Sequence, residues 1–353
     1  MIPLGDHNGG RSSPDRADDG RSTRRSSGRA LAVEELTVSV QREDGRHIAV
    51  DGVSFEVVAG SAFGLVGESG SGKSLTLRAL ISLLPPAASV EGGGVLLHGQ
   101  RLPITGRGAR RARRGEMAMI FQDSLSALNP VQGIGSQIAE APQRLLGLSR
   151  RRAWERALEL LRLVGIPDPA STAHAYPHQI SGGMRQRVAI AIALSTEPSV
   201  LLCDEPTTAL DVTVQAQILD LLDDLRRRLD LAIVFVSHDL AVIRQLCDET
   251  AVMYTGRLVE TGPSQAVLAE PTHPYTRGLL SAIVDLGDPV GAPTPIPGSL
   301  PDIERLPSGC TFHPRCFLAT AECASTVPEL AAAAGAADNH RSACIHRDRL
   351  VHA

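Results

Sequence analysis

The chain has 353 residues, a length that corresponds to about two domains. Apolar residues make up 43% and charged residues 21%, which is typical of globular rather than disordered proteins. The formal charge of −4 gives no reason to expect a nucleic acid or an acidic lipid as partner, and with no apolar signal region and no run of about 18 apolar residues we expect a soluble, cytosolic protein.

In chain order, a polar tail precedes a set of short strands. Residues 1–30 are rich in Gly, Ser, Arg and Asp and have no hydrophobic periodicity, so we expect this segment to be disordered. From residue 31 onward, short apolar segments bounded by glycine or charge predict strands. These segments are 31–40, 52–58, 62–67, 94–99 and 117–122.

Helices and strands then alternate. Apolar residues that recur every three or four positions predict helices within 134–165 and over 181–195, 212–229 and 239–247. The strands expected between and after them are 199–204, 231–237 and 250–256. This alternation predicts an α/β fold with a largely parallel sheet. A helix and a Pro/Gly-rich linker are expected over 264–308, and a small cysteine-bearing module over 309–353.

A single lysine marks the first candidate site. Of the 35 basic residues only Lys73 is a lysine, and it lies in GESGSGKS between an expected strand and an expected helix. This matches the phosphate-binding loop G-x-x-x-x-G-K-S/T, in which glycines and a helix N-terminus present amides to phosphate. A plain glycine-rich turn, the alternative, does not explain the position of the lysine. The expected nucleotide-binding residues are Gly67, Glu68, Ser69, Gly70, Ser71, Gly72, Lys73 and Ser74.

An acidic pair supports this site. Asp204 and Glu205 follow the apolar segment VLLC, so both are expected at the end of a buried strand. There Asp204 could hold Mg²⁺ together with the Ser74 hydroxyl, and Glu205 could polarise the attacking water.

Further motifs resemble those of ATP-binding-cassette (ABC) ATPases. They are Gln122, SGGMRQR at 181–187, ALD at 209–211 and His238, in the order of that family. The resemblance covers roughly residues 31–263 and implies a RecA-like core, an antiparallel β subdomain and a helical subdomain that bears the signature. A GTPase is excluded because its Asn-Lys-x-Asp motif needs a second lysine.

The resemblance also implies roles for these residues. Two cassettes would pack head to tail, so that the signature residues contact the ATP of the partner subunit. The signature comprises Ser181, Gly182, Gly183 and Met184, where Met184 replaces the commonest residue, glutamine. Gln122 would approach the Mg²⁺, and Asp211 belongs to the D-loop. Lys73, Glu205 and His238 would be catalytic, with His238 contacting the γ-phosphate.

One feature departs from the family. Cassettes usually stack adenine on an aromatic ring, but residues 41–50 contain none. Arg46 or His47 is expected to substitute by planar stacking.

The subfamily can be narrowed. SGGMRQRV, DEPTTALDVTVQAQIL (204–219), HPYTRGLLSAI (273–283) and the cysteine-bearing extension resemble the ATPase subunit of oligopeptide, dipeptide or nickel importers. The resemblance implies ATP and Mg²⁺ as ligands, a second ABC ATPase, two membrane permeases, an external solute-binding protein and no nucleic acid. It places the protein at the cytoplasmic face of the cell membrane. A nucleotide-binding regulatory subunit with little turnover is the alternative, as is an importer of nickel or another small solute.

The cysteines fall into two groups. Cys203 and Cys247 lie in apolar segments and are expected to be buried thiols. Disulfides are not expected in a reducing cytosol. The spacings between the four cysteines after residue 309 are wider than those typical of zinc sites. Four thiolates suit a 4Fe–4S cluster. The importer subunits that this chain resembles carry such a cluster, and the resemblance implies Cys310, Cys316, Cys323 and Cys344 as its ligands here. Zinc, with His313, His340 or His346 as further donors, and free thiols remain alternatives.

Overall fold

The computed structural model describes residues 28–104, 106–122, 128–208, 210–282, 295–333, 337 and 339–350. Expectations for most of the N-terminal tail, for the segment after Gln122, for Ala209 and for the Pro/Gly-rich stretch 283–294 lie outside the described residues. In the described part of the chain, none of the helices has the length and apolar character that a membrane span requires.

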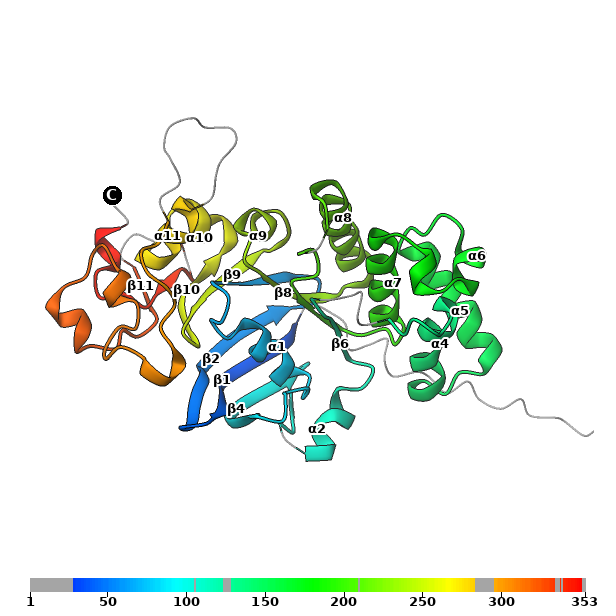
Figure 1. Ribbon diagram of the computed structural model, residues 1–353, viewed down its shortest axis with the longest axis horizontal. Helices are drawn as coiled ribbons and strands as arrows, with labels where there is room; N and C mark the ends of the chain where they lie inside the picture. Colours follow the sequence, from blue (N-terminus) through cyan, green and yellow to red (C-terminus); the bar gives the residue numbers. More distant parts are fainter. Residues whose placement is uncertain are drawn as a thin grey trace, which may run out of the picture.

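The first sheet is antiparallel and has the strand order β2-β1-β4-β5. Its strands are β1 (Arg29–Arg42), β2 (Gly45–Val58), β4 (Ala88–Leu97) and β5 (Gln100–Leu102). It lies below the main sheet in Figure 1. β1 begins at Arg29, within the expected tail, because Arg29 and the residues after it pair with the end of β2.

The main sheet has the order β11-β12-β10-β9-β3-β8-β7-β6. The run from β9 to β6 is parallel, which confirms the expected fold class, and the other strands add antiparallel. The bounds are β3 (Ala62–Val66), β6 (Met117–Ile120), β7 (Val200–Asp204), β8 (Ala232–Ser237), β9 (Glu249–Tyr254), β10 (Arg257–Pro263), β11 (Ala331–Ala332) and β12 (Arg341–Ser342).

The helices cover the main sheet and form a separate lobe. The helices around the sheet are α1 (Lys73–Leu80), α8 (Val212–Leu229), α9 (Leu240–Leu246), α10 (Ser264–Ala269) and α11 (Pro274–Ser281), whereas α2 (Gly106–Arg113) lies beside the antiparallel sheet. The lobe contains α4 (Ile134–Leu145), α5 (Arg150–Leu163), α6 (Pro169–His174) and α7 (Gly182–Leu194), shown in green in Figure 1. The helices expected over 134–165, 181–195, 212–229 and 239–247 are thereby confirmed.

The main sheet is buried on both faces. Along β7, Leu201 and Cys203 belong to one hydrophobic cluster, whereas Val200 and Leu202 belong to the other. This alternation follows from the two-residue period of a strand, and burial on both faces explains why the strand sequences are apolar throughout. Cys203 and Cys247 are buried thiols, as expected.

The C-terminal module packs on the cassette and does not stand apart from it. Its strand β12 pairs with β10, with Ser342 opposite Glu260. The Phe312 ring lies 5.2 Å from the Tyr254 ring and 5.3 Å from the Tyr275 ring, both in the main core. Phe312 belongs to the hydrophobic core cluster of the cassette, so the module shares that core.

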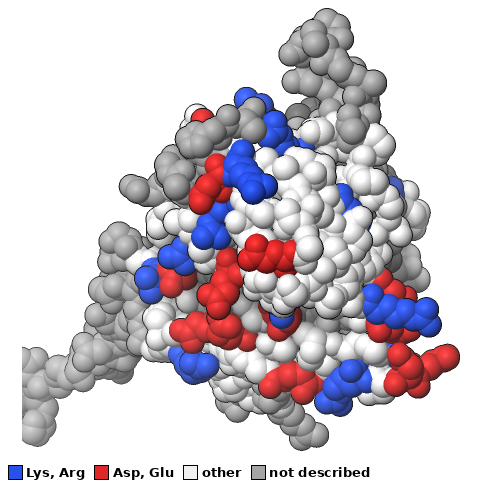
Figure 2. Space-filling model, turned by 90° about the vertical axis from the view of Figure 1, so that its left-hand side faces the viewer, with Lys and Arg blue, Asp and Glu red and all other residues white. Residues whose placement is uncertain are grey.

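The surface on the side of this module carries charges of both signs. Figure 2 shows acidic and basic side chains side by side along the left and lower margins of the face, around a broad area without charge. In α8, Arg226 and Arg227 both pair with Asp223 one turn earlier; Arg227 is exposed, whereas Arg226 is largely buried and also pairs with Asp248.

Candidate nucleotide-binding site

The phosphate loop connects β3 to α1 and requires glycine at specific positions. Gly67 has a φ of +155°, and a Cβ placed there would lie 2.2 Å from the Met253 carbonyl oxygen. Gly72, with a φ of +108°, immediately precedes the first residue of α1. The backbone can therefore turn tightly and aim the N-terminus of α1, with its unpaired amides, into the loop.

Lys73 lies inside this loop. Its ammonium group donates hydrogen bonds to the carbonyl oxygens of Gly67 at 2.7 Å and Glu68 at 2.9 Å. Burial lowers the pKa of Lys73, whereas the nearby carboxylates of Glu205 and Asp204 act in the opposite direction. The single lysine of the chain is thus a buried cation, and its partners are loop carbonyls that a phosphate could replace.

Ser74 and Asp204 form the second part of the site. The Ser74 hydroxyl donates a 2.7 Å hydrogen bond to Asp204 Oδ1 at the end of β7. Burial raises the pKa of Asp204, and the bond from Ser74 counteracts this effect. A hydroxyl and a carboxylate in contact are oxygen ligands of the kind that Mg²⁺ prefers, so the pair fits the expected ion.

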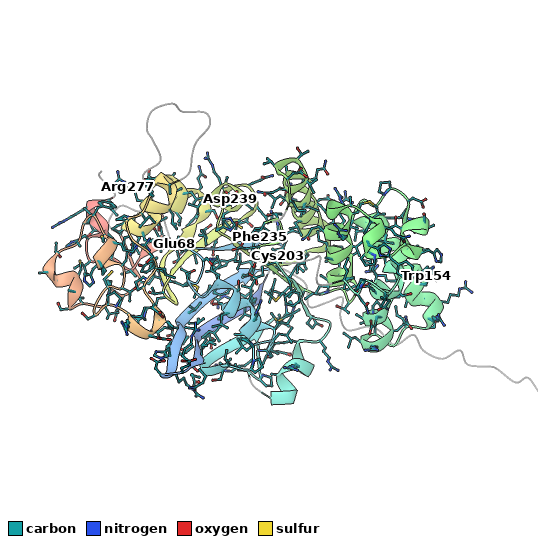
Figure 3. The ribbon with its side chains drawn as sticks, viewed as in Figure 1. Glu68, Trp154, Cys203, Phe235, Asp239 and Arg277 are labelled. Carbon is teal, nitrogen blue, oxygen red and sulfur yellow. The ribbon has the colours of Figure 1, made fainter. Side chains whose placement is uncertain are left out.

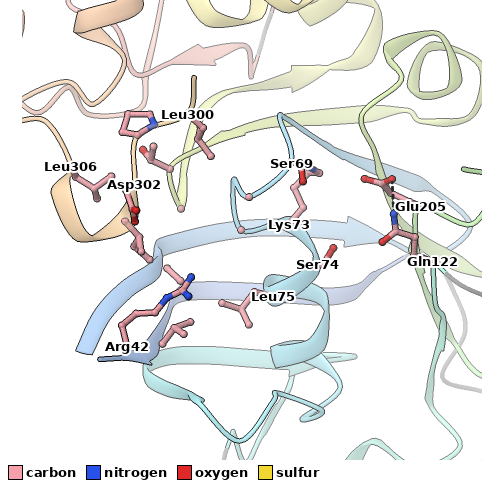
Figure 4. A pocket seen from close by; sticks show the side chains of 18 residues that line it. Arg42, Ser69, Lys73, Ser74, Leu75, Gln122, Glu205, Leu300, Asp302 and Leu306 are labelled. Atoms are coloured by element: carbon pink, nitrogen blue, oxygen red, sulfur yellow. Dashed lines mark hydrogen bonds between the residues drawn. The ribbon is translucent and has the colours of Figure 1, made fainter. Parts of the chain in front are cut away.

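Three polar side chains converge on one oxygen of Glu205. Gln122 Nε2 donates to Glu205 Oε2 at 3.3 Å (dashed in Figure 4), and the Thr208 hydroxyl donates to the same oxygen at 2.9 Å. His238 Nδ1 lies 3.1 Å from it. Glu205 itself adopts a left-handed φ of +46°, which is costly for a residue other than glycine and typical of functional sites. Gln122, Glu205 and His238 were predicted from the sequence, whereas Thr208 was not.

One cavity of about 430 Å³, a volume in the range of small-molecule sites, is lined by part of this set, whereas Asp204, Thr208 and His238 are not among its lining residues. Its lining includes Lys73 and Ser74 in the middle and Gln122 and Glu205 at one end. Ser69, Gly70 and Gly72 also line it. Arg46 and His47 are not among the residues that line this cavity. Arg46 pairs with Glu91 and His47 with Asp44, so neither takes the base-stacking position that the sequence analysis expected.

The signature residues lie elsewhere. Ser181 caps α7 and accepts a hydrogen bond from the Met184 amide, and Asp211 caps α8 in the same way through the Val214 amide. A Cβ at Gly183 would lie 2.9 Å from Val214, whereas Gly182 faces open space. None of the residues from Ser181 to Met184 is among those that line the cavity.

Comparisons with known proteins place this site in a family. The family "ABC transporter" matches residues 50–208, and "Oligopeptide/dipeptide transporter, C-terminal region" matches residues 259–323. A protein of Brucella abortus (strain 2308) named "Putative peptide import ATP-binding protein" is 47% identical over 87% of this chain and 93% of its own length. The chain belongs to the oligopeptide/dipeptide family of ABC transporter ATP-binding proteins.

Other relatives agree with this assignment. The dipeptide transport ATP-binding protein DppD of Bacillus subtilis (strain 168) is 44% identical to this ABC ATPase over 82% of the chain and 87% of its own length. Among solved structures, cbiO1 from Clostridium perfringens, part of the ABC transporter complex cbiONQ, superposes with a TM-score of 0.60 at 27% identity, covering 69% of this chain and 91% of its own. The ATP-binding cassette MJ0796, a dimer bound to ADP and Pi, superposes with a TM-score of 0.58 at 25% identity. The match covers 66% of this chain and 98% of that structure's chain.

Two residues of the ABC ATPase that the sequence analysis missed hold Glu68 of the phosphate loop. Arg315, in the C-terminal module, forms a bidentate ion pair with the Glu68 carboxylate, and the Tyr275 hydroxyl accepts a 2.8 Å hydrogen bond from the Glu68 amide. Figure 3 shows Glu68 between the cassette and the module. No local sequence signal identifies these partners, because they are distant in the chain.

The four cysteines of the module lie near one another. The thiols of Cys310, Cys316 and Cys323 lie close enough to Cys344 for each to raise its pKa. Burial raises the pKa of Cys316 and of Cys344, each to about 11. Within the described ranges, however, no group of three His, Cys, Asp or Glu side chains is arranged so that it could hold a metal ion.

Proposed function

We propose that this ABC ATPase binds and hydrolyses Mg·ATP to drive peptide import through partner permeases. The observation that carries the proposal is the position of Glu205, whose carboxylate accepts bonds from Gln122 and Thr208 at the edge of the cavity that contains Lys73. Peptide as the solute is supported by the relatives, which are named as peptide import and dipeptide transport ATP-binding proteins. Nickel or another small solute is the alternative.

The proposed roles follow from the contacts. The Lys73 ammonium exchanges its loop carbonyls for the β- and γ-phosphate oxygens, and the amides at the start of α1 bind the same phosphates. Ser74, Asp204 and Gln122 are proposed to hold Mg²⁺, which would neutralise charge on the phosphates. Glu205 accepts the proton of the attacking water, and His238 orients that water and contacts the γ-phosphate.

The partner subunit completes the site in this proposal. Because Ser181, Gly182 and Gly183 lie away from the cavity of their own chain, their amides at the start of α7 are free to contact the γ-phosphate of ATP bound to a second cassette. A second, non-identical ABC ATPase, two membrane permeases and an external solute-binding protein are the proposed partners. The proposed location is the cytoplasmic face of the cell membrane.

Replacement of the base tests the proposed chemistry. In the assembled pair, with the second site disabled, Glu205→Gln should lower single-turnover hydrolysis by about 100-fold or more. Bound ATP should remain, because the amide keeps the shape of the side chain. Undiminished hydrolysis would contradict the role of Glu205. Low turnover in the wild-type site would instead favour a nucleotide-binding regulatory subunit.

We further propose that Cys310, Cys316, Cys323 and Cys344 hold a 4Fe–4S cluster, with zinc as the alternative. Two observations support the proposal: three thiols lie close enough to Cys344 to raise its pKa, and the amides of Leu318 and His346 donate to the sulfur atoms of Cys316 and Cys344 at 3.3 Å each. Iron and sulfide analysis of anaerobically purified protein should give about four of each per chain. Stoichiometric zinc, or protein free of both metals, would contradict it.

A further inference from the structure

The nucleotide cavity has a wall that belongs to neither the phosphate loop nor the acidic pair. Beyond Lys73, it is lined on one side by Val40, Arg42 and Ala49 of the antiparallel sheet. On the other side it is lined by the segment Leu300–Leu306, which we name the C-terminal wall. Figure 4 shows Arg42 and Leu306 at the end of the cavity opposite Gln122 and Glu205. The base of a nucleotide whose terminal phosphates lie at Lys73 would point to this end.

The C-terminal wall is apolar where it borders the cavity. Leu300, Ile303 and Leu306 present aliphatic side chains, and Leu306 is 39% exposed, high for a leucine. No aromatic side chain is among the described residues that line the cavity. The side chain of Asp302 already accepts a hydrogen bond from the Glu304 amide. The flat faces of a base can therefore be covered by aliphatic groups and by the planar guanidinium of Arg42.

The wall is fixed to the phosphate loop. Arg315, whose side chain is 6% exposed, forms the bidentate pair with Glu68 and donates a further hydrogen bond to the Pro297 carbonyl oxygen at 2.8 Å. Gly70, two residues after Glu68 in the phosphate loop, lies next to Leu300: a Cβ on Gly70 would be 3.4 Å from Leu300 Cδ2. The chain is thus anchored just before the wall at Pro297, and the wall itself packs on Gly70. Its position is set before any nucleotide binds.

We propose that Leu300–Leu306 forms the base-binding wall of the nucleotide site and, with Arg42, takes the place of a stacked aromatic ring. The inference rests on the proposed function, because it assigns the base end of the same ATP site. Apolar contacts cover a base without distinguishing the hydrogen-bonding groups on its edge. ATP and GTP should therefore bind with affinities within about threefold of each other.

The test compares nucleotide with triphosphate alone. In the full-length chain, Ile303→Ser combined with Leu306→Ser should weaken Mg·ATP binding by about tenfold, since two apolar contacts with the base are lost. Binding of inorganic tripolyphosphate, which has no base, should not change. Arg305→Ser is the matched control, because Arg305 is exposed on the same turn and does not line the cavity. It should bind ATP as the wild type does.

Each outcome is decisive. Wild-type ATP affinity in the double variant, or an equal loss of tripolyphosphate binding, would overturn the inference. Failure of the wild-type protein to bind either ligand would instead contradict the proposed function. Folding is checked by circular dichroism, and a second variant, Leu306→Ser alone, changes only the exposed side chain and should give an intermediate loss of ATP affinity.

Discussion

Arg315 and Glu68, which are 247 positions apart in the chain, form a bidentate ion pair with N–O distances of 2.7 and 2.9 Å. Glu68 belongs to the phosphate loop and Arg315 to the C-terminal module. A fork of two parallel hydrogen bonds fixes both distance and orientation, which a single contact would not. The module is therefore attached directly to the loop that is proposed to bind ATP.

Removal of this pair should loosen the module. Arg315→Ala should lower the free energy of unfolding by about 2 kcal/mol, because it leaves the partly buried Glu68 carboxylate without its partner. Urea titration followed by circular dichroism measures the change. Arg315→Lys, which keeps the charge but not the two parallel hydrogen bonds, should lower the free energy of unfolding by a smaller amount. The exposed Arg305→Ala should have no measurable effect, and an equal loss there would argue against a specific role for the pair.

A buried histidine predicts how stability depends on pH. Burial lowers the pKa of His273 to about 4, from an ordinary value of 6.5, although Glu260 nearby acts in the opposite direction. The folded state thus binds fewer protons at His273 than the unfolded state does between these values. Its contribution is fully present above pH 6.5 and is lost as the pH falls toward 4.

This contribution should amount to roughly 3 kcal/mol across that window. His273→Asn should reduce the dependence of the free energy of unfolding on pH between 6.5 and 4, as measured by denaturant titration at several pH values. The carboxylate of Glu260 and the ring of His340, which are 2.7 Å apart in the same buried cluster, are unchanged in that variant. An unaltered slope would show that His273 does not carry the effect.

Thr208 should act by positioning Glu205. Thr208→Val keeps the shape of the side chain but removes the 2.9 Å hydrogen bond to Glu205 Oε2. We expect kcat to fall about tenfold with KM unchanged, because the bond orients the base rather than the nucleotide. A change in KM alone would identify Thr208 as a binding residue instead.

The signature can be tested by two alanine substitutions at sites with open space. A Cβ at Gly182 has its nearest neighbour 4.0 Å away, and a Cβ at Gly108, in another helix, has none within 4 Å. Neither variant should lose stability. Gly182→Ala should nonetheless abolish ATP turnover in the assembled pair, because the added methyl group would meet the partner's γ-phosphate. Gly108→Ala should turn over ATP normally, and full activity in both would contradict the role of the signature.

Local patterns predicted the elements of the site, whereas contacts between distant segments were missed. The position of Lys73 in a glycine-rich loop, and of Asp204 and Glu205 after VLLC, depends on a few neighbouring residues that the sequence displays. The pairing of Arg315 with Glu68 depends on how the chain returns after α11, which has no such signal. For the same reason, a segment interpreted as a linker supplies Leu300 to the nucleotide cavity.

The base-stacking prediction was limited in a similar way. Arg46 and His47 were selected by their distance from Lys73 in the sequence, but each has an acidic partner on the antiparallel sheet. The strand β10 was not predicted, although only Thr255 and Gly256 separate it from β9. Thr208 was missed because a threonine beside the acidic pair has no distinctive spacing.

The most direct measurement concerns Lys73 itself. Lys73→Met removes the ammonium but keeps an unbranched apolar side chain in its place, and the far-ultraviolet circular dichroism should match that of the wild type. Titration with Mg·ATP, followed by a hydrolysis assay in the assembled pair, should then give no measurable turnover and a strongly reduced affinity for both ATP and tripolyphosphate. Binding and turnover at wild-type levels would contradict the assignment of this cavity to ATP.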